Sequence, residues 1–190
     1  MAIGLFYSTM SGTTKQVATS IRMIFGGESV VLHNIDEVSA DRLSGYDKLI
    51  FGAPTMGDGE LSDEWDDWID DIDPAHILGK TVALYGLGDQ KGYPDTFADA
   101  LGIIYDRMVE YGAQLVGRWP TVGYDYETSK AEREGRFVGL VIDDDNQPDK
   151  TESRVRKWVE SVLGDFDTGA DLEASAGGLK TDHKTGMTNE

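Results

Sequence analysis

Short apolar runs alternate with amphipathic stretches along most of this chain. The runs lack the polar alternation of a half-exposed strand, and such runs are typical of parallel strands that are buried on both faces. They predict strands at residues 2–7, 29–32, 48–53, 81–86 and 114–116, and a further apolar run covers 137–142.

The stretches between these runs carry apolar residues at the spacing of one helix face. They predict helices at residues 14–25, 62–72, 97–111 and 152–163. Trp65, Trp68 and Trp158 lie on these apolar faces and are expected in the core. Strands separated by helices in this way favour an α/β fold, a doubly wound three-layer sandwich around a five-stranded parallel sheet.

Two segments do not follow the alternation. Residues 118–136 are polar and aromatic and separate the fifth strand from the run at 137–142, so we interpret them as an insertion at the edge strand. Residues 167–190 are rich in glycine and polar residues, which predicts a disordered C-terminal tail. The folded domain is therefore expected to cover residues 1–166.

Composition narrows the function classes. The 190 residues include 35 Asp plus Glu and 17 Lys plus Arg, a net charge of −18, so nucleic acids and anionic membranes would be repelled. The absence of cysteine excludes disulfides, iron–sulfur clusters and thiol catalysis. No apolar run approaches the ~20 residues of a membrane span, and the N-terminus lacks a basic signal region. We therefore expect a cytoplasmic protein whose partners carry basic surfaces.

The spacing of the three histidines does not indicate a metal site. His33, His76 and His183 are scattered and lack metal-ligand spacing, so we expect them at the surface. No metal is predicted.

The loop after the first strand has the composition of a phosphate site. In an open sheet of this class, ligands bind outside the carboxyl ends of the strands. Here hydroxyl residues surround one glycine before a helix, whose free N–H groups attract anions. Ser and Thr are also ordinary helix caps, so the loop alone leaves both interpretations open. Its residues are Thr9, Met10, Ser11, Gly12, Thr13 and Thr14.

The loops after the third and fourth strands can hold a flat ring. Gly57 gives backbone freedom, and Met56 gives a polarisable side chain. In the next loop Asp89 and Gln90 can pair with a heterocycle edge, and Tyr93 can stack on its face. Each loop read alone also fits an ordinary turn before a helix. Together the three loops describe a site for one phosphate and one flat ring.

At these residues the chain resembles the flavodoxins. The motif T-x-T/S-G-x-T corresponds to residues 9–14, P-T-x-x-x-G-E-L to 54–61 and G-D-Q-x-G-Y to 88–93. The insertion and the D-N-Q sequence at 145–147 resemble the long-chain subfamily. The G-L-G-D-Q sequence and the aliphatic Met56 resemble flavodoxins associated with nitrogen fixation. The resemblance covers nearly everything but the tail and implies the strand order 2-1-3-4-5.

The resemblance also implies a non-covalently bound FMN and one-electron transfer at low potential. Residues 9–14 would hold the phosphate, while Met56 and Tyr93 would face the two sides of the ring. The protein would be a monomeric electron carrier rather than an enzyme, with a reductase as donor, a metalloenzyme as acceptor and nitrogenase reductase as one candidate. The remaining implied ring contacts are Pro54, Thr55, Gly57, Asp58, Gly59, Leu87, Gly88, Asp89 and Gln90.

Further features bear on how such a flavin would be tuned. A peptide flip at Gly57 would let its carbonyl accept a hydrogen bond from flavin N5, which would favour uptake of the first electron. Carboxylates such as Asp58, Asp89 and Asp145 would lower the potential of the second electron. The acidic residues at 63–73 are either a solvated helix face or a docking patch for basic redox partners.

Two other function classes stay open. The same fold also serves NAD(P)H-dependent FMN or quinone reductases, but this chain has no second nucleotide motif. A flavodoxin-like domain can also bind a partner without redox work.

Overall fold

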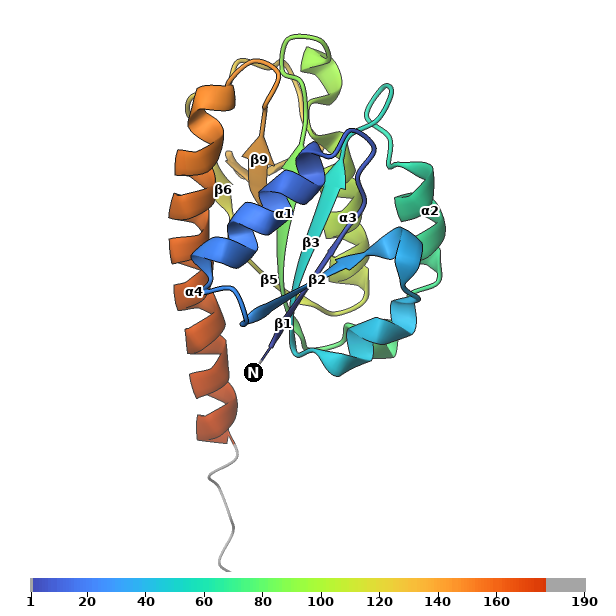
Figure 1. Cartoon of the computed structure of the whole chain (residues 1–190), viewed down its shortest axis with the longest axis vertical. Coiled ribbons are helices and arrows are strands. Elements are labelled where there is room, and N and C mark those ends of the chain that lie inside the picture. The colour runs from blue at the N-terminus through green and yellow to red at the C-terminus, as the bar shows by residue number, and fades with distance from the viewer. Residues whose placement is uncertain (1, 177–190) are drawn as a thin grey trace, which may run out of the picture.

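The computed structural model describes residues 2–176, and its centre is a parallel sheet (Figure 1). The strands pair in the order β2-β1-β3-β4-β5, and every pairing among them is parallel. This finding confirms the predicted strand order. The strands are β1 (Ile3–Tyr7), β2 (Val30–Asn34), β3 (Lys48–Pro54), β4 (Thr81–Leu87) and β5 (Gln114–Val116).

Two short strands share the edge position of the sheet. β5 pairs with residues 81–83 of β4, and β9 (Leu140–Ile142) pairs with residues 85–87. Between them the chain leaves the main sheet and forms a small antiparallel one. Its strands are β6 (Trp119–Pro120), β8 (Arg136–Phe137) and β7 (Glu132–Arg133). The predicted insertion therefore divides the edge strand, and β9 brings the chain back to the carboxyl end of β4.

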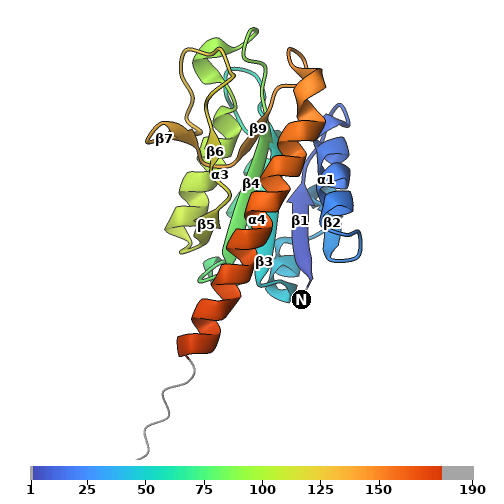
Figure 2. The same ribbon diagram turned by 90° about the vertical axis from the view of Figure 1, so that its left-hand side faces the viewer.

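Within residues 2–176, α-helices cover both faces of the sheet (Figures 1 and 2). On one face α1 (Thr13–Ile24) and α4 (Pro148–Ala176) pack against each other and on the sheet. The opposite face is covered by α2 (Asp63–Asp70) and α3 (Asp99–Glu110). Short 3-10 helices lie in the connections, at Ile35–Glu37, Ala40–Gly45, Pro74–His76 and Pro94–Thr96.

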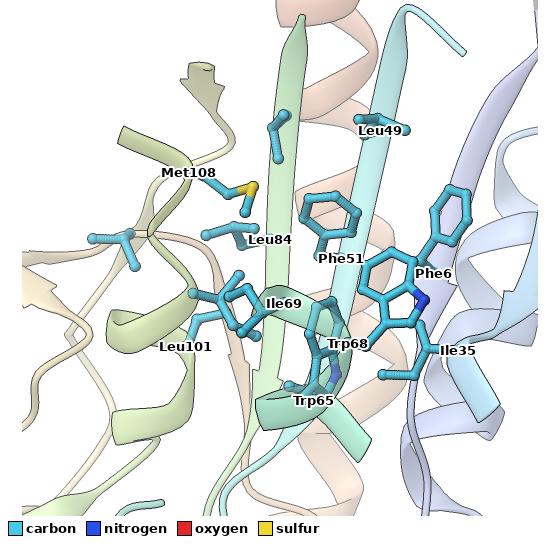
Figure 3. Packing of buried hydrophobic residues seen from close by; sticks show 14 of the residues in the cluster. Phe6, Ile35, Leu49, Phe51, Trp65, Trp68, Ile69, Leu84, Leu101 and Met108 are labelled. Carbon is cyan, nitrogen blue, oxygen red and sulfur yellow. The ribbon is translucent and has the colours of Figure 1, made fainter. Parts of the chain in front are cut away.

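The tryptophans predicted for the core are buried, and their polar atoms are satisfied. Trp65 and Trp68 pack edge to face between α2 and the sheet (Figure 3). Their indole N–H groups donate to the carbonyls of Gly52 and Val38, each at 3.0 Å. The Ser62 hydroxyl caps α2 by accepting from the Trp65 amide. The cap and these bonds fix α2 beside the loop that follows β3.

α4 is longer than its apolar periodicity predicts. The helix extends beyond both predicted ends and runs to Ala176, so residues 167–176, expected to be disordered, are helical. The polar and glycine residues in this stretch concealed the continuation. The rest of the expected tail, residues 177–190, lies outside the described residues.

The prediction that His33 lies at the surface is wrong. His33 is only 8% exposed, and its ring stacks on Phe6, its register partner in β1. Its Nε2 lies 2.7 Å from the Tyr46 hydroxyl. Burial lowers the pKa of His33, and Arg42 adds to the effect. His76 is half-buried, and His183 lies outside the described residues. Within residues 2–176 no helix is long and apolar enough to cross a membrane.

Candidate functional site

A cleft of about 320 Å³ lies at the carboxyl ends of the strands, where Figure 1 shows the loops after β1, β3, β4 and β9 gathering at the top. The cleft brings together residues from all three loops that the sequence singles out. Of the predicted site residues, those that line it are Met10, Ser11, Thr13, Thr14, Pro54, Thr55, Met56, Gly57, Leu87, Gly88, Asp89 and Tyr93. The predicted residues that do not line it are Thr9, Gly12, Asp58, Gly59 and Gln90.

The loop after β1 is folded around Gly12. Gly12 has a φ of +94°, and its amide donates to the Thr9 hydroxyl at 3.0 Å. The Ser11 and Thr13 hydroxyls lie 3.2 Å apart. α1 begins at Thr13, and the first N–H groups of a helix have no partner within it. Thr9 and Gly12 thus shape the loop, while the wall of the cleft receives hydroxyls and the positive end of a helix dipole.

The loop after β3 closes on itself. The Met56 amide donates to the Glu60 carbonyl at 2.9 Å, and the Glu60 amide donates back at 2.8 Å. Gly57 and Gly59 have φ values of +44° and +99°. A Cβ on Gly59 would lie 2.8 Å from the Asp99 carboxylate, so that glycine is required by close packing against α3.

The side-chain hydroxyl of Thr55 is the next feature of this loop, because it lacks a hydrogen-bond partner among the described residues. The Thr55 amide donates to the Leu87 carbonyl at 3.1 Å, which joins the loops after β3 and β4. Its Oγ1 is buried and has no hydrogen-bond partner among the described residues. Because buried polar groups are nearly always paired, this unpaired hydroxyl at the wall of the cleft indicates a place for a ligand.

The loop after β4 is organised by the Asp89 carboxylate. Its Oδ1 accepts from the amides of Lys91 and Gly92, at 3.1 and 2.8 Å. The Asn146 side chain donates to the same oxygen at 2.7 Å. The Gly92 amide is the main reason that the pKa of Asp89 is lowered from its ordinary value, and Asn146 and Lys91 contribute. Asp89 therefore stays ionised, and the loop holds Tyr93, 48% exposed, at the rim of the cleft.

Gln90 connects the loop after β4 to the insertion and to the residues that follow β9. Its side-chain oxygen accepts from the Asp125 amide at 2.5 Å, which ties the insertion to this loop. The backbone N–H of Gln90 donates to the buried Asp143 carboxylate at 3.1 Å. Asn146 also donates to Asp143, and so bridges it to Asp89. The side-chain oxygen of Gln90 is thus engaged by the insertion.

Five further residues line the cleft: Thr96, Phe97, Ala98, Asp144 and Asp145. Sequence reasoning anticipated only Asp145, as a nearby carboxylate. Asp144 and Asp145 come shortly after the end of β9 at Ile142, so the rule that ligands lie at strand carboxyl ends would have found both once β9 was placed beside β4. Phe97 and Ala98 carried no sequence signal, because they look like the first residues of an amphipathic helix.

The insertion packs over the edge of the sheet through aromatic side chains. The indole of Trp119 donates to the Tyr124 hydroxyl at 3.0 Å, and that hydroxyl donates to the Val141 carbonyl at 2.5 Å. Burial raises the pKa of Tyr124 to about 12. The Arg154 guanidinium lies 4.0 Å from the centre of the Tyr124 ring. These contacts hold the insertion against α4 and beside the cleft.

Comparison with known proteins gives one consistent answer. The sequence profile of the flavodoxin family matches residues 5–158. The chain is 48% identical to the flavodoxin of Synechococcus elongatus over 165 residues, which are 86% of this chain and 97% of that protein. It is 41% identical to the flavodoxin of Klebsiella pneumoniae over 168 residues, which are 84% and 96% of the two chains.

Solved structures agree with the sequence relatives. The crystal structure of Fusobacterium nucleatum flavodoxin bound to flavin mononucleotide has a TM-score of 0.80 and 29% identity, over 86% of this chain and 98% of that one. Its fold has the same parallel sheet in the order 2-1-3-4-5. On its profile match and its sequence relatives, the chain belongs to the flavodoxin family.

Proposed function

We propose that this chain binds FMN non-covalently in the cleft and carries single electrons at low potential between redox proteins. The observation that supports this most directly is the buried, unpartnered Thr55 hydroxyl at the wall of the cleft. Flavodoxins are FMN-binding electron carriers, and the Fusobacterium nucleatum relative is bound to FMN. The function proposed here is therefore electron transfer rather than catalysis.

The loop after β1 fits the phosphate group. Hydroxyls of Ser11, Thr13 and Thr14 and the free N–H groups of the first turn of α1 would hold its oxygens. Thr9 and Gly12 would act by fixing the loop. The described residues that line the cleft include no Lys or Arg, so neutral donors and the helix dipole would compensate the phosphate charge.

The loops after β3 and β4 fit a flat ring. Met56 and Tyr93 would contact its two faces, because a thioether and an aromatic ring both give large dispersion contact with a π-system. Leu87 and Gly88 would line one edge, and the Thr55 hydroxyl would hydrogen-bond to the ligand. Pro54 and Asp58–Gly59 would complete the second loop, and Gln90 would keep the third in place.

FMN, when bound, supplies the capacity to accept and release electrons, and the surrounding residues set how readily it does so. The carboxylates of Asp89, Asp144 and Asp145 lie at the cleft and disfavour additional negative charge there. The Gly57 carbonyl accepts no hydrogen bond among the described residues, and its positive φ makes a peptide flip accessible. The carboxylates would lower the potential at which the flavin takes up its second electron. The Gly57 peptide would affect the potential for the first electron.

The partners follow from charge and shape. The acidic residues at 63–73 on and after α2 would steer basic redox proteins toward the cleft. The insertion that divides the edge strand supports assignment to the long-chain subfamily. Nitrogenase reductase is the acceptor that the G-L-G-D-Q sequence favours. We propose that the protein works as a monomer in the cytoplasm.

Flavin titration tests the binding site. Full-length protein freed of flavin is titrated with FMN, and flavin fluorescence is followed. We expect one FMN per chain and much weaker binding of riboflavin, which has the same ring but no phosphate. Equal affinity for both flavins would contradict the phosphate assignment of residues 9–14, and no binding of either would overturn the proposed function.

A further inference from the structure

The hydroxyl of Tyr85 is a buried polar group in the middle of the sheet. Tyr85 belongs to β4, is 0% exposed, and packs in the core between the sheet and the pair α1 and α4. Its hydroxyl donates to the Thr14 carbonyl at 3.0 Å. Burial raises the pKa of Tyr85 well above its ordinary value, so the hydroxyl stays a donor at neutral pH.

Gly52 leaves the space that this side chain occupies. Gly52 and Tyr85 are register partners in β3 and β4. A Cβ on Gly52 would lie 2.0 Å from Cζ of the Tyr85 ring and 2.2 Å from its hydroxyl oxygen. The Tyr85 ring therefore lies across the β3 backbone on its way to α1, and it fits only because residue 52 has no side chain.

The acceptor of this hydrogen bond lies in the loop proposed to hold phosphate. Thr14 is in the first turn of α1, is 2% exposed, and lines the cleft. In an α-helix its carbonyl also accepts from the amide four residues later, so Tyr85 adds a second donor to the same oxygen. The bond joins the first turn of α1 to the strand whose carboxyl end carries Leu87 and Gly88.

We propose that Tyr85 is a positioning residue for the phosphate part of the site. By holding the Thr14 carbonyl, in the space left by Gly52, it fixes the first turn of α1 at a set distance from β4. Charge-assisted hydrogen bonds are short and directional. A small shift of this turn would therefore weaken the hydrogen bonds from its N–H groups and hydroxyls to a phosphate. The ring loops remain anchored by the strand pairings of β4. This role rests on the proposed binding of FMN.

The variant Tyr85→Phe tests the role because it removes the hydroxyl and keeps the ring. Titration of the full-length variant with FMN and with riboflavin should show FMN binding weakened by about three- to tenfold and riboflavin binding unchanged. A purely structural loss would weaken both ligands alike. The matched control is Tyr105→Phe, because Tyr105 lies on α3 beside Arg133, away from the residues that line the cleft; it should change neither affinity.

The outcomes separate this role from the proposed function. A wild-type protein that binds FMN, with an unchanged ratio of FMN to riboflavin affinity in Tyr85→Phe, would overturn the positioning role alone. A wild-type protein that binds neither flavin would overturn both. A loss of FMN affinity without a loss of riboflavin affinity in Tyr85→Phe would support the role directly, because a general loss of stability weakens both ligands alike.

Discussion

Replacing Thr55 by valine should stabilise the ligand-free protein and weaken FMN binding by the same free energy. The Thr55 hydroxyl is buried, lies at the wall of the cleft, and has no partner among the described residues. Leaving a buried hydroxyl unsatisfied costs about 1–3 kcal/mol. Valine has nearly the same shape and removes the hydroxyl, so the free energy of unfolding of the ligand-free variant should rise by about that amount.

The effect on binding has the opposite sign. In the proposed complex FMN provides the missing hydrogen-bond partner, so binding to the wild type recovers the energy that the empty site lacks. The valine variant has no unpaired hydroxyl, so FMN binding gains no hydrogen bond at this position. Its FMN affinity should therefore fall by about 1–3 kcal/mol, which is about 5- to 150-fold. The stability of the FMN-saturated protein should change little, because the gain in stability of the ligand-free variant and its loss of FMN binding energy cancel.

Two measurements check this balance. Urea unfolding of the ligand-free proteins gives the change in stability, and fluorescence titration gives the change in FMN affinity. Thr81→Val is the matched control, because Thr81 begins β4 at the end of the strand remote from the cleft; its FMN affinity should be unchanged. A Thr55→Val protein that is less stable without ligand, and equally tight with FMN, would refute the reasoning.

Other substitutions test the surroundings of the cleft. Asn146→Ala should raise the pKa of Asp89, measured by NMR of the carboxyl carbon, because it removes one of the donors that lower it. The lowered pKa of Asp89 adds stability above about pH 4, and this stability is lost as the pH falls through the pKa that Asp89 has in the folded protein. The variant should therefore lose less stability than the wild type on acidification. Gly57→Val, at a φ of +44°, should lower the first one-electron midpoint potential of the FMN-loaded protein by on the order of 50 mV; an unchanged potential would contradict a role for this peptide. Neutralising Asp66 and Asp67 together should slow association with a basic redox protein and flatten its salt dependence, measured by stopped flow.

The layers followed from apolar runs that needed no tertiary information, whereas the strand order was implied by the family resemblance. Residues 49–53 have no polar position and are all buried, so only a sheet covered on both faces can bury them. The insertion was also visible, because polar residues interrupt the last strand. Its effect was not, because β5 and β9 pair with different halves of β4 and only the folded register shows this.

The candidate site was predictable where local backbone chemistry builds it. Glycines and hydroxyls near residues 9–14 and 56–59 indicate loops at strand ends, and the structure brings them to one cleft. His33 was wrongly expected at the surface because its partner Tyr46 cannot be recognised from its neighbours in sequence. The bond between Gln90 and the Asp125 amide was not predictable for the same reason, since the two residues are 35 positions apart.

Anaerobic redox titration of the FMN-loaded protein tests the central proposal most directly. We expect a yellow protein that takes up two electrons in two separate one-electron steps, the second at a low potential. The visible spectrum should then pass through a distinct form between the two limits. Reduction in a single two-electron step, together with steady NADPH oxidation by the protein alone, would contradict the account and identify a reductase.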